Sequence, residues 1–187
     1  MEAAERLIRS AQELLWERGY VGSSPKAIQL AAGAGQGSMY HHFSGKADLA
    51  LTAIERSAAE LRAAAEEQFT AAGTATERVT GYLERDREVL KGCRIGRLTT
   101  DPEVMADPDL RAPVDETFRW LRQRLAEVIA EGKQTGEYPA RLDPEEVAAT
   151  IAAVLQGGYV LARAANSVEP FDQAVHGLTS LLSQATE

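Results

Sequence analysis

The sequence contains only one cysteine, Cys93, among its 187 residues. One cysteine cannot form a disulfide within the chain, and such scarcity is typical of proteins kept in a reducing compartment. An unbroken apolar run of about 18 residues is also missing, as is a charged start that leads into an apolar segment. We therefore expect a cytoplasmic protein with neither a membrane span nor a secretory leader.

Positive charge is scarce as well. The chain carries 20 Lys and Arg against 28 Asp and Glu, a net charge of −8, which argues at first against a nucleic-acid partner. The charge is uneven, however, because residues 1–46 hold five basic side chains and four glutamates, which leaves +1 there and −9 in the remainder. A near-neutral head on an acidic body is compatible with DNA binding, since the local field at the contact face matters more than the total.

The motifs of enzymes are missing too. We find no glycine-rich phosphate loop, no metal-ligand spacing and no nucleophile–base set. His41 and His42 are adjacent, but neighbouring side chains on a helix point apart, and His176 is the one other histidine. We therefore expect no catalytic residue, no metal and no cofactor.

The pattern of apolar residues predicts helices throughout. Apolar positions recur three and four residues apart, and no alternating β-branched run suggests a strand. The segment 92–108 is expected to be irregular, because Asp101-Pro102 and Asp107-Pro108 are typical helix breakers. The fold predicted is all-α, with about nine helices. The main expected helices span 3–18, 25–32, 36–42, 46–69, 75–90, a stretch of about 24 residues around 114–129, 144–165 and 170–184.

Two of these helices, over 25–32 and 36–42, are short and are joined by the turn Gly33-Ala34-Gly35. A longer helix precedes them, and short helices of this size need such a support. Together the three have the geometry of a helix-turn-helix, whose last helix enters the major groove of DNA.

The side chains of the segment 36–42 suit a DNA groove. Gln36 can pair with a base edge, while Ser38 and Tyr40 can donate to phosphates. Met39 and Phe43 are expected to face the core. Tyr40 could alternatively be a core residue, since a buried ring with a solvated hydroxyl fits both interpretations.

Residues 31–46 read Ala-Ala-Gly-Ala-Gly-Gln-Gly-Ser-Met-Tyr-His-His-Phe-Ser-Gly-Lys. This run resembles the TetR signature, a loose A-G-V-S-x-G-[ST]-[LM]-Y-x-[HY]-F-x-x-K, and the similarity extends over about residues 4–54. The resemblance implies a DNA-binding domain over 1–46 and an effector-binding and dimerisation domain over 47–187. It places at a double-stranded DNA operator the residues Ser24, Lys26, Gln36, Gly37, Ser38, Tyr40, His41 and Lys46.

Three positions depart from that family pattern. Gly35 stands where a serine N-cap is usual, Gln36 where a lysine or arginine is common, and Pro25 where valine is usual. The first two changes remove a helix cap and a phosphate charge. We therefore expect base contacts of Gln36 to contribute more of the discrimination between DNA sequences.

The helix over 144–165 is apolar nearly all round, so it must be covered on two sides. Together with the last helix it could form a four-helix interface across the two-fold axis of a homodimer, and the alternative is a monomer core. The expected interface residues are Ile151, Val154, Leu155, Gly158, Phe171, Val175, Leu178 and Leu182.

The second domain should also hold a pocket for a small-molecule effector, lined by apolar and aromatic residues with a few polar ones. Each of these residues could instead be plain core. Arg163 could pair with an anionic effector or with a neighbouring carboxylate, and Cys93 could be a redox sensor or a buried structural thiol. The predicted pocket residues are Phe69, Tyr82, Cys93, Leu98, Met105, Phe118, Trp120, Leu121, Gln156, Tyr159 and Arg163.

Together with these features, the resemblance to the TetR family implies a ligand-responsive transcriptional repressor. The two recognition helices of a dimer would enter successive major grooves of a palindromic operator, about 34–36 Å apart, and an effector would release the DNA. An enzyme is the first alternative, and no motif supports it. An activator or a ligand-independent regulator is the second, and the sequence does not distinguish it from a repressor.

Overall fold

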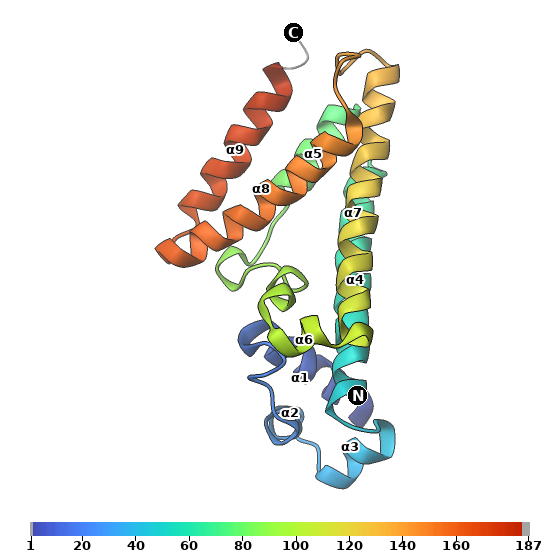
Figure 1. The fold of residues 1–187 in the computed structure, drawn as a ribbon, viewed down its shortest axis with the longest axis vertical. Helices are drawn as coiled ribbons and strands as arrows, with labels where there is room; N and C mark the ends of the chain where they lie inside the picture. The colour runs from blue at the N-terminus through green and yellow to red at the C-terminus, as the bar shows by residue number, and fades with distance from the viewer. Residues whose placement is uncertain (1, 185–187) are drawn as a thin grey trace. The chain divides into compact units, whose positions relative to one another are not determined.

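The computed structural model describes residues 2–184, whose path is drawn in Figure 1. These residues form nine α-helices and two 3₁₀ helices without a strand, so the predicted all-α fold is confirmed. The helices are α1 (Ala3–Arg18), α2 (Pro25–Ala32), α3 (Gln36–His42), α4 (Lys46–Phe69), α5 (Ala75–Glu84), η1 (Val89–Lys91), η2 (Gly96–Thr100), α6 (Pro102–Ala106), α7 (Pro108–Gln134), α8 (Pro144–Ala165) and α9 (Glu169–Gln184).

The chain divides into two compact units. The first consists of residues 1–60 and 93–117, and the second of residues 61–92 and 118–187. Two long helices, α4 and α7, each pass from one unit into the other. The boundary expected after residue 46 stays a prediction.

Aspartate–proline pairs begin three of the helices. The carboxylates of Asp101, Asp107 and Asp143 accept hydrogen bonds from backbone amides in the first turns of α6, α7 and α8, each with proline as the first helical residue. Proline is well placed there because its missing N–H is not needed. As expected, the segment 92–108 is irregular, with only the short helices η2 and α6 in it, and each Asp-Pro pair ends one helix and begins the next.

The helix α5 ends at Glu84, well before the predicted end near Leu90. The guanidinium of Arg87 turns back onto its last turn and donates to the carbonyls of Leu83 (2.8 Å) and Tyr82. The last carbonyls of a helix have no backbone amide to bind within the helix, and here the guanidinium of Arg87 supplies the missing donors. A side chain from beyond the helix thus helps to fix its end, which periodicity does not reveal.

In the first unit, residues 93–101 are tied to α1 and the turn after it. The guanidinium of Arg94 lies 4.1 Å from the ring centroid of Trp16 and pairs with Glu13 at 2.8 Å. Arg97 donates to the backbone carbonyls of Trp16 and Glu17. The segment therefore packs with the helix-turn-helix although some 80 residues separate them in sequence.

Asp101 also connects this segment to the turn after α1. It is 7% exposed, and its carboxylate accepts from the amide of Val21 at 3.0 Å as well as from the start of α6. A Cβ built on Gly19 would lie 2.8 Å from Asp101 Oδ2, and Gly19 has a φ of +74°. Glycine is thus required at the end of α1 by both backbone conformation and space.

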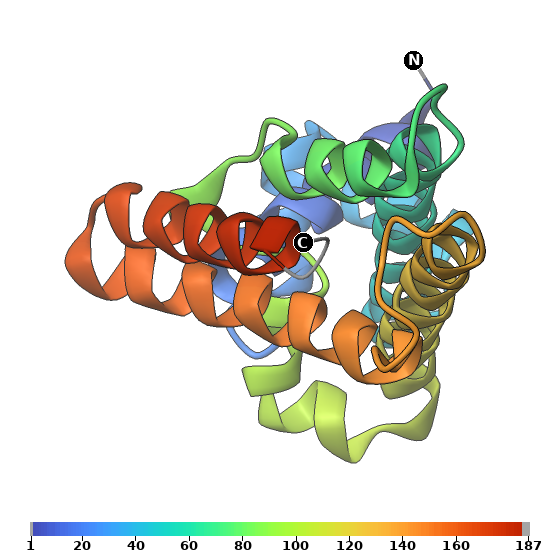
Figure 2. The same ribbon diagram turned by 90° about the horizontal axis from the view of Figure 1, so that it is seen from above.

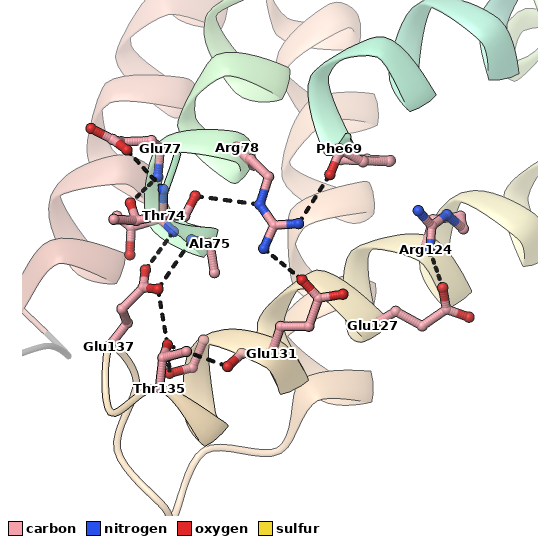
Figure 3. Close-up of polar contacts among 12 residues, drawn as sticks. Phe69, Thr74, Ala75, Glu77, Arg78, Arg124, Glu127, Glu131, Thr135 and Glu137 are labelled. Atoms are coloured by element: carbon pink, nitrogen blue, oxygen red, sulfur yellow. Dashed lines mark hydrogen bonds and ion pairs between the residues drawn. The ribbon is translucent and has the colours of Figure 1, made fainter. Parts of the chain in front are cut away.

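In the second unit, α5 begins with a capping box (Figure 3). Thr74 Oγ1 accepts from the amide of Glu77 at 3.1 Å, and Glu77 Oε2 accepts from the amide of Thr74 at 2.8 Å. Glu137 accepts from the amides of Ala75 and Thr76. Burial alone would raise the pKa of Glu137, but these amides outweigh it and the pKa is lowered. The first turn of α5 therefore has its donors satisfied by side chains.

The helices α8 and α9 lie side by side (Figures 1 and 2). Gly158 permits their close approach, because a Cβ there would lie 2.9 Å from Phe171 Cδ2. Ile151 and Leu155 on the same stripe of α8 are buried in the core that the helices of this unit share.

By length and composition alone, α8 could also cross a membrane. The search for an unbroken apolar run did not find α8, because a few polar residues interrupt it. Its many alanines and glycines nevertheless keep the helix apolar on average. Core helices of soluble proteins have the same composition. In α8 only 33% of the most apolar window is buried, so apolar surface remains open to a partner.

Candidate functional site

The two short helices α2 and α3 are held together by local polar contacts. Ser24 Oγ caps α2 by accepting from the amide of Ala27 at 3.1 Å. Gly33 ends α2 in the left-handed region, with a φ of 57°, and so turns the chain toward α3. Gln29 Nε2 lies 3.2 Å from the sulfur of Met39, which joins the two helices. This is the arrangement of a helix-turn-helix.

The exposed residues Gln36, Gly37, Tyr40 and His41 lie on one side of α3 and are called the reading face below. Met39 and Phe43 are buried on the opposite side, as predicted. The side chain of Tyr40 is 52% exposed, which does not fit a role purely in the core. The polar groups of α3 are therefore placed where a DNA groove could reach them.

The first turn of α3 has no side-chain cap, since its N-cap residue is Gly35. A Cβ at Gly35 or at Gly37 would meet no atom within 4 Å. Neither glycine is thus required by packing within the chain. At Gly37 the missing side chain leaves the backbone of α3 open to a close neighbour.

The remaining predicted DNA contacts flank this helix. Ser24 and Lys26 are exposed, whereas Ser38 and Lys46 are half-buried. Lys46 Nζ lies 3.8 Å from the ring centroid of Tyr20, a cation–π contact. The ring of Tyr20 therefore already positions the side chain of Lys46 for the predicted contact with the DNA backbone.

The rings of His41 and His42 lie edge to face with centroids 4.8 Å apart. The expectation that they point apart is therefore wrong, because their rotamers turn the rings toward each other. Within residues 2–184, no group of three or more His, Cys, Asp or Glu side chains is arranged to hold a metal ion.

Most of the residues expected at a dimer interface lie inside the chain's own second unit. All but the half-buried Val154 are buried, mainly where α8 packs on α9, so they form no exposed face. The physical reason is that α8 is apolar on two sides, and its periodicity does not tell which side meets α9. The residues placed in this way are Ile151, Leu155, Gly158, Phe171, Val175, Leu178 and Leu182.

A different stripe of α8 is exposed, and its residues Ala153, Gly157, Val160 and Leu161 are called the open face below. Val160 and Leu161 are large apolar side chains exposed to 67% and 54%. A Cβ at Gly157 would meet no atom within 4 Å. On α9, Leu181 is also exposed. Within residues 2–184, these helices therefore leave apolar surface uncovered.

The residues predicted to line an effector pocket are divided between the two units. Cys93, Leu98 and Met105 belong to the first unit, and all the others to the second. In the second unit, the rings of Phe69 and Tyr82 lie 4.9 Å apart within the core. Phe118, Trp120, Gln156 and Tyr159 are half-buried, Leu121 is buried and Arg163 is exposed.

Cys93 is half-buried, and its sulfur accepts from the amide of Gly96 at 3.2 Å. The two arginines that could stabilise its thiolate, Arg94 and Arg97, both contact α1 instead. The residues next to this thiol therefore have a structural role, since they connect the segment to α1.

Sequence reasoning missed a cavity between the end of α5 and α9 in the second unit. Its volume is about 440 Å³, and none of the predicted pocket residues lines it. Two arginines, Arg85 and Arg87, contribute to its wall. In the sequence they stand in a charged run with Asp86, a pattern typical of a solvated surface, so no signal marked them.

The reading face on a helix-turn-helix defines a DNA-binding transcription regulator. A family model described as "Bacterial regulatory proteins, tetR family" matches residues 7–53, and one described as "Tetracyclin repressor-like, C-terminal domain" matches residues 73–178, more than half of the chain. The chain belongs to the TetR family of transcription regulators, and this is not a family of enzymes.

Individual relatives agree with this assignment. The chain is 25% identical over 186 residues to the "HTH-type transcriptional repressor DhaR" of Mycobacterium sp. (strain GP1), with 98% of this chain and 93% of the relative covered. It is 29% identical over 153 residues to the "Transcriptional regulator AcuR" of Cereibacter sphaeroides, with 78% and 69% covered. The solved structure of a "regulatory protein TetR from Rhodobacter sphaeroides" superposes with a TM-score of 0.82 at 26% identity, with 98% of each chain covered.

Proposed function

We propose that this regulator binds a palindromic operator as a homodimer in the cytoplasm, represses transcription there, and leaves the DNA when a small-molecule effector binds. The observation that carries the proposal is the reading face. Gln36, Tyr40 and His41 present base-reading and phosphate-binding groups to solvent from a helix anchored by buried Met39.

The homodimer is supported by the open face of α8. Exposed Val160 and Leu161 lie beside Gly157, which leaves room for the backbone of a partner helix. A second copy of the chain would present the same apolar surface, and a two-fold axis would bring the two surfaces together. The same axis would give the operator its palindromic symmetry, with half-sites about 34–36 Å apart.

The release of DNA is supported by the path of the chain. Because α4 and α7 pass through both units, a displacement of either helix in the second unit is carried along a continuous helix into the first. The effector must bind the released conformation more tightly by a few kcal/mol to empty the operator. We propose that its site lies in the second unit, where the predicted pocket residues of that unit, such as Phe69, Trp120 and Arg163, are its first candidates.

Footprinting of the promoter region of the chain's own gene tests the operator. We expect protection of a symmetric site, with one dimer bound and with affinity falling steeply as salt rises. Gln36→Ala should weaken binding to that site, whereas Gln134→Ala, the same change at an exposed position of α7, should not. Equal affinity for random DNA, or protection of an asymmetric site by a monomer, would contradict the proposal.

Effector release needs a separate measurement. Small organic acids, amides and alcohols are screened for compounds that raise the melting temperature of the free protein. We expect at least one of them to lower the affinity for the footprinted site. If every compound that binds leaves operator affinity unchanged, the effector-dependent part of the proposal fails while the operator part stands.

A further inference from the structure

The cavity between the end of α5 and α9 has the size and lining of a small-molecule site. Its volume of about 440 Å³ lies within the range of roughly 300–1,000 Å³ that such sites occupy. Apolar side chains from both sides of the cavity line it, among them Leu83, Val89, Phe171 and Val175. An apolar ligand body would find contacts there.

The cavity wall also carries two cations without an ionic partner. Within residues 2–184, neither Arg85 nor Arg87 forms an ion pair with a carboxylate. Arg87 lies 5.3 Å from the ring centroid of Tyr82 and 6.0 Å from that of Phe171, and it donates to the backbone carbonyls of Tyr82, Leu83 and Arg85. Arg85 Nε is buried and finds no hydrogen-bond partner among the described residues.

Both guanidinium groups are partly buried. A buried charge is normally paired, because its removal from water is costly. Burial lowers the pKa of the Arg87 guanidinium, and the neighbouring cation of Arg85 also acts to lower it. The acidic residues at the cavity, Glu84, Asp86 and Asp172, are exposed to solvent. The two guanidinium groups therefore lack a countercharge that an anion would supply.

We propose that the α5–α9 cavity binds a small organic carboxylate, with its charged end on Arg85 and Arg87 and its apolar body against Phe171 and Val175. A carboxylate matches the planar fork of a guanidinium, and its two oxygens can accept parallel hydrogen bonds. The inference rests on the proposed function only in naming this ligand as the effector, since binding itself needs no DNA.

Arg87 has a structural role as well, because it holds the carbonyls at the end of α5. A variant at Arg87 could therefore lose its fold along with its ligand. Arg85 makes no such contact: its backbone is extended beyond the helix and its side chain lies over the Tyr82 ring at 5.4 Å. The test is accordingly built on Arg85.

Calorimetric titration of the full chain without DNA tests the site, with 3-phenylpropanoate as the probe and 3-phenylpropanamide as its uncharged counterpart. We expect the wild-type chain to bind the acid at least about ten-fold more tightly than the amide, since charged hydrogen bonds contribute about 1.5–3 kcal/mol. Arg85→Gln should abolish this preference, and Arg85→Lys, which keeps the charge but not the fork, should reduce it. Arg141→Gln, at an exposed position between α7 and α8, should behave as wild type.

Equal binding of acid and amide by the wild-type chain, or an unchanged preference in Arg85→Gln, would overturn the carboxylate site. The same samples are then tested for operator binding. If the acid binds but operator affinity does not change, the cavity is a carboxylate site but not the effector site. If another compound releases the operator and the acid does not bind, the carboxylate site is rejected and the proposed function stands.

Discussion

The reading face of α3 and the open face of α8 both present groups that no other described residue covers, but their chemistry is opposite. The reading face offers an amide, a phenol and an imidazole, whereas the open face offers valine, leucine and small residues. Polar groups stay solvated when a partner leaves, so they suit a complex that forms and dissociates with salt and effector. Apolar groups suit a partner that stays. The comparison therefore supports the proposal that the reading face serves an exchangeable partner and the open face a permanent one.

The largest effect is expected from a change in the open face of α8, the proposed surface for the permanent partner. Leu161→Glu would place a charge in the proposed dimer interface, so we expect dimerisation at least about 100-fold weaker, with the fold retained. Sedimentation over a range of concentrations measures it. Leu90→Glu, the same change at an exposed leucine of η1, is the control. A dimer of undiminished strength in Leu161→Glu would place the interface elsewhere.

Two adjacent glycines of α8 separate assembly from folding. Gly158→Ala should lower the free energy of unfolding by about 1–3 kcal/mol, because its Cβ would overlap Phe171. Gly157→Ala has open space and should raise it by about 0.5–1 kcal/mol through helix propensity. Urea unfolding in the Leu161→Glu background removes the contribution of the dimer. Equal changes in the free energy of unfolding for the two variants would contradict the described contact between Gly158 and Phe171.

The exchangeable side is tested first at Tyr40. Tyr40→Ala should reduce operator affinity about 10- to 100-fold, because the exposed ring and hydroxyl are lost from the DNA contact. The free energy of unfolding should change by no more than about 0.5 kcal/mol, as for other exposed positions. Fluorescence anisotropy and thermal melting measure the two quantities. A melting temperature lowered by many degrees would show that Tyr40 acts mainly in the core.

A smaller effect is expected at Gln36, where specificity should change more than affinity. Gln36→Ala should reduce discrimination at one base pair by about 1–3 kcal/mol and leave binding to random DNA nearly unchanged. Competition between single-base operator variants provides the measurement. Losses of equal size on operator and random DNA would remove the base-reading role.

Local signals made most of the fold predictable. The ends of α2 and the start of α5 are fixed by nearby residues such as Ser24, Gly33 and Thr74, which the sequence displays. The end of α5 was not predictable, because it depends on where the side chain of Arg87 turns. A side chain that turns back onto the helix from just beyond its end leaves no mark in the apolar periodicity.

The sites were predictable in unequal measure. The reading face follows from a contiguous motif, so seven residues of one helix suffice to describe it. The packed side of α8 depends on the contact of Gly158 with Phe171, two positions whose pairing the sequence does not display. The proposed site in the α5–α9 cavity depends on Arg85 and Arg87 forming no ion pair within residues 2–184, and this is visible only in three dimensions.

The contacts of Asp101 have a consequence for engineering. Its carboxylate joins the amide of Val21, in the turn after α1, to the first turn of α6. A chimera that exchanged only residues 1–46 for another reader would keep Asp101 but confront it with a foreign turn. A functional graft should therefore carry residues 93–101 with the new reader, or choose a donor that has glycine at the position of Gly19. The transplantable module is discontinuous in the gene.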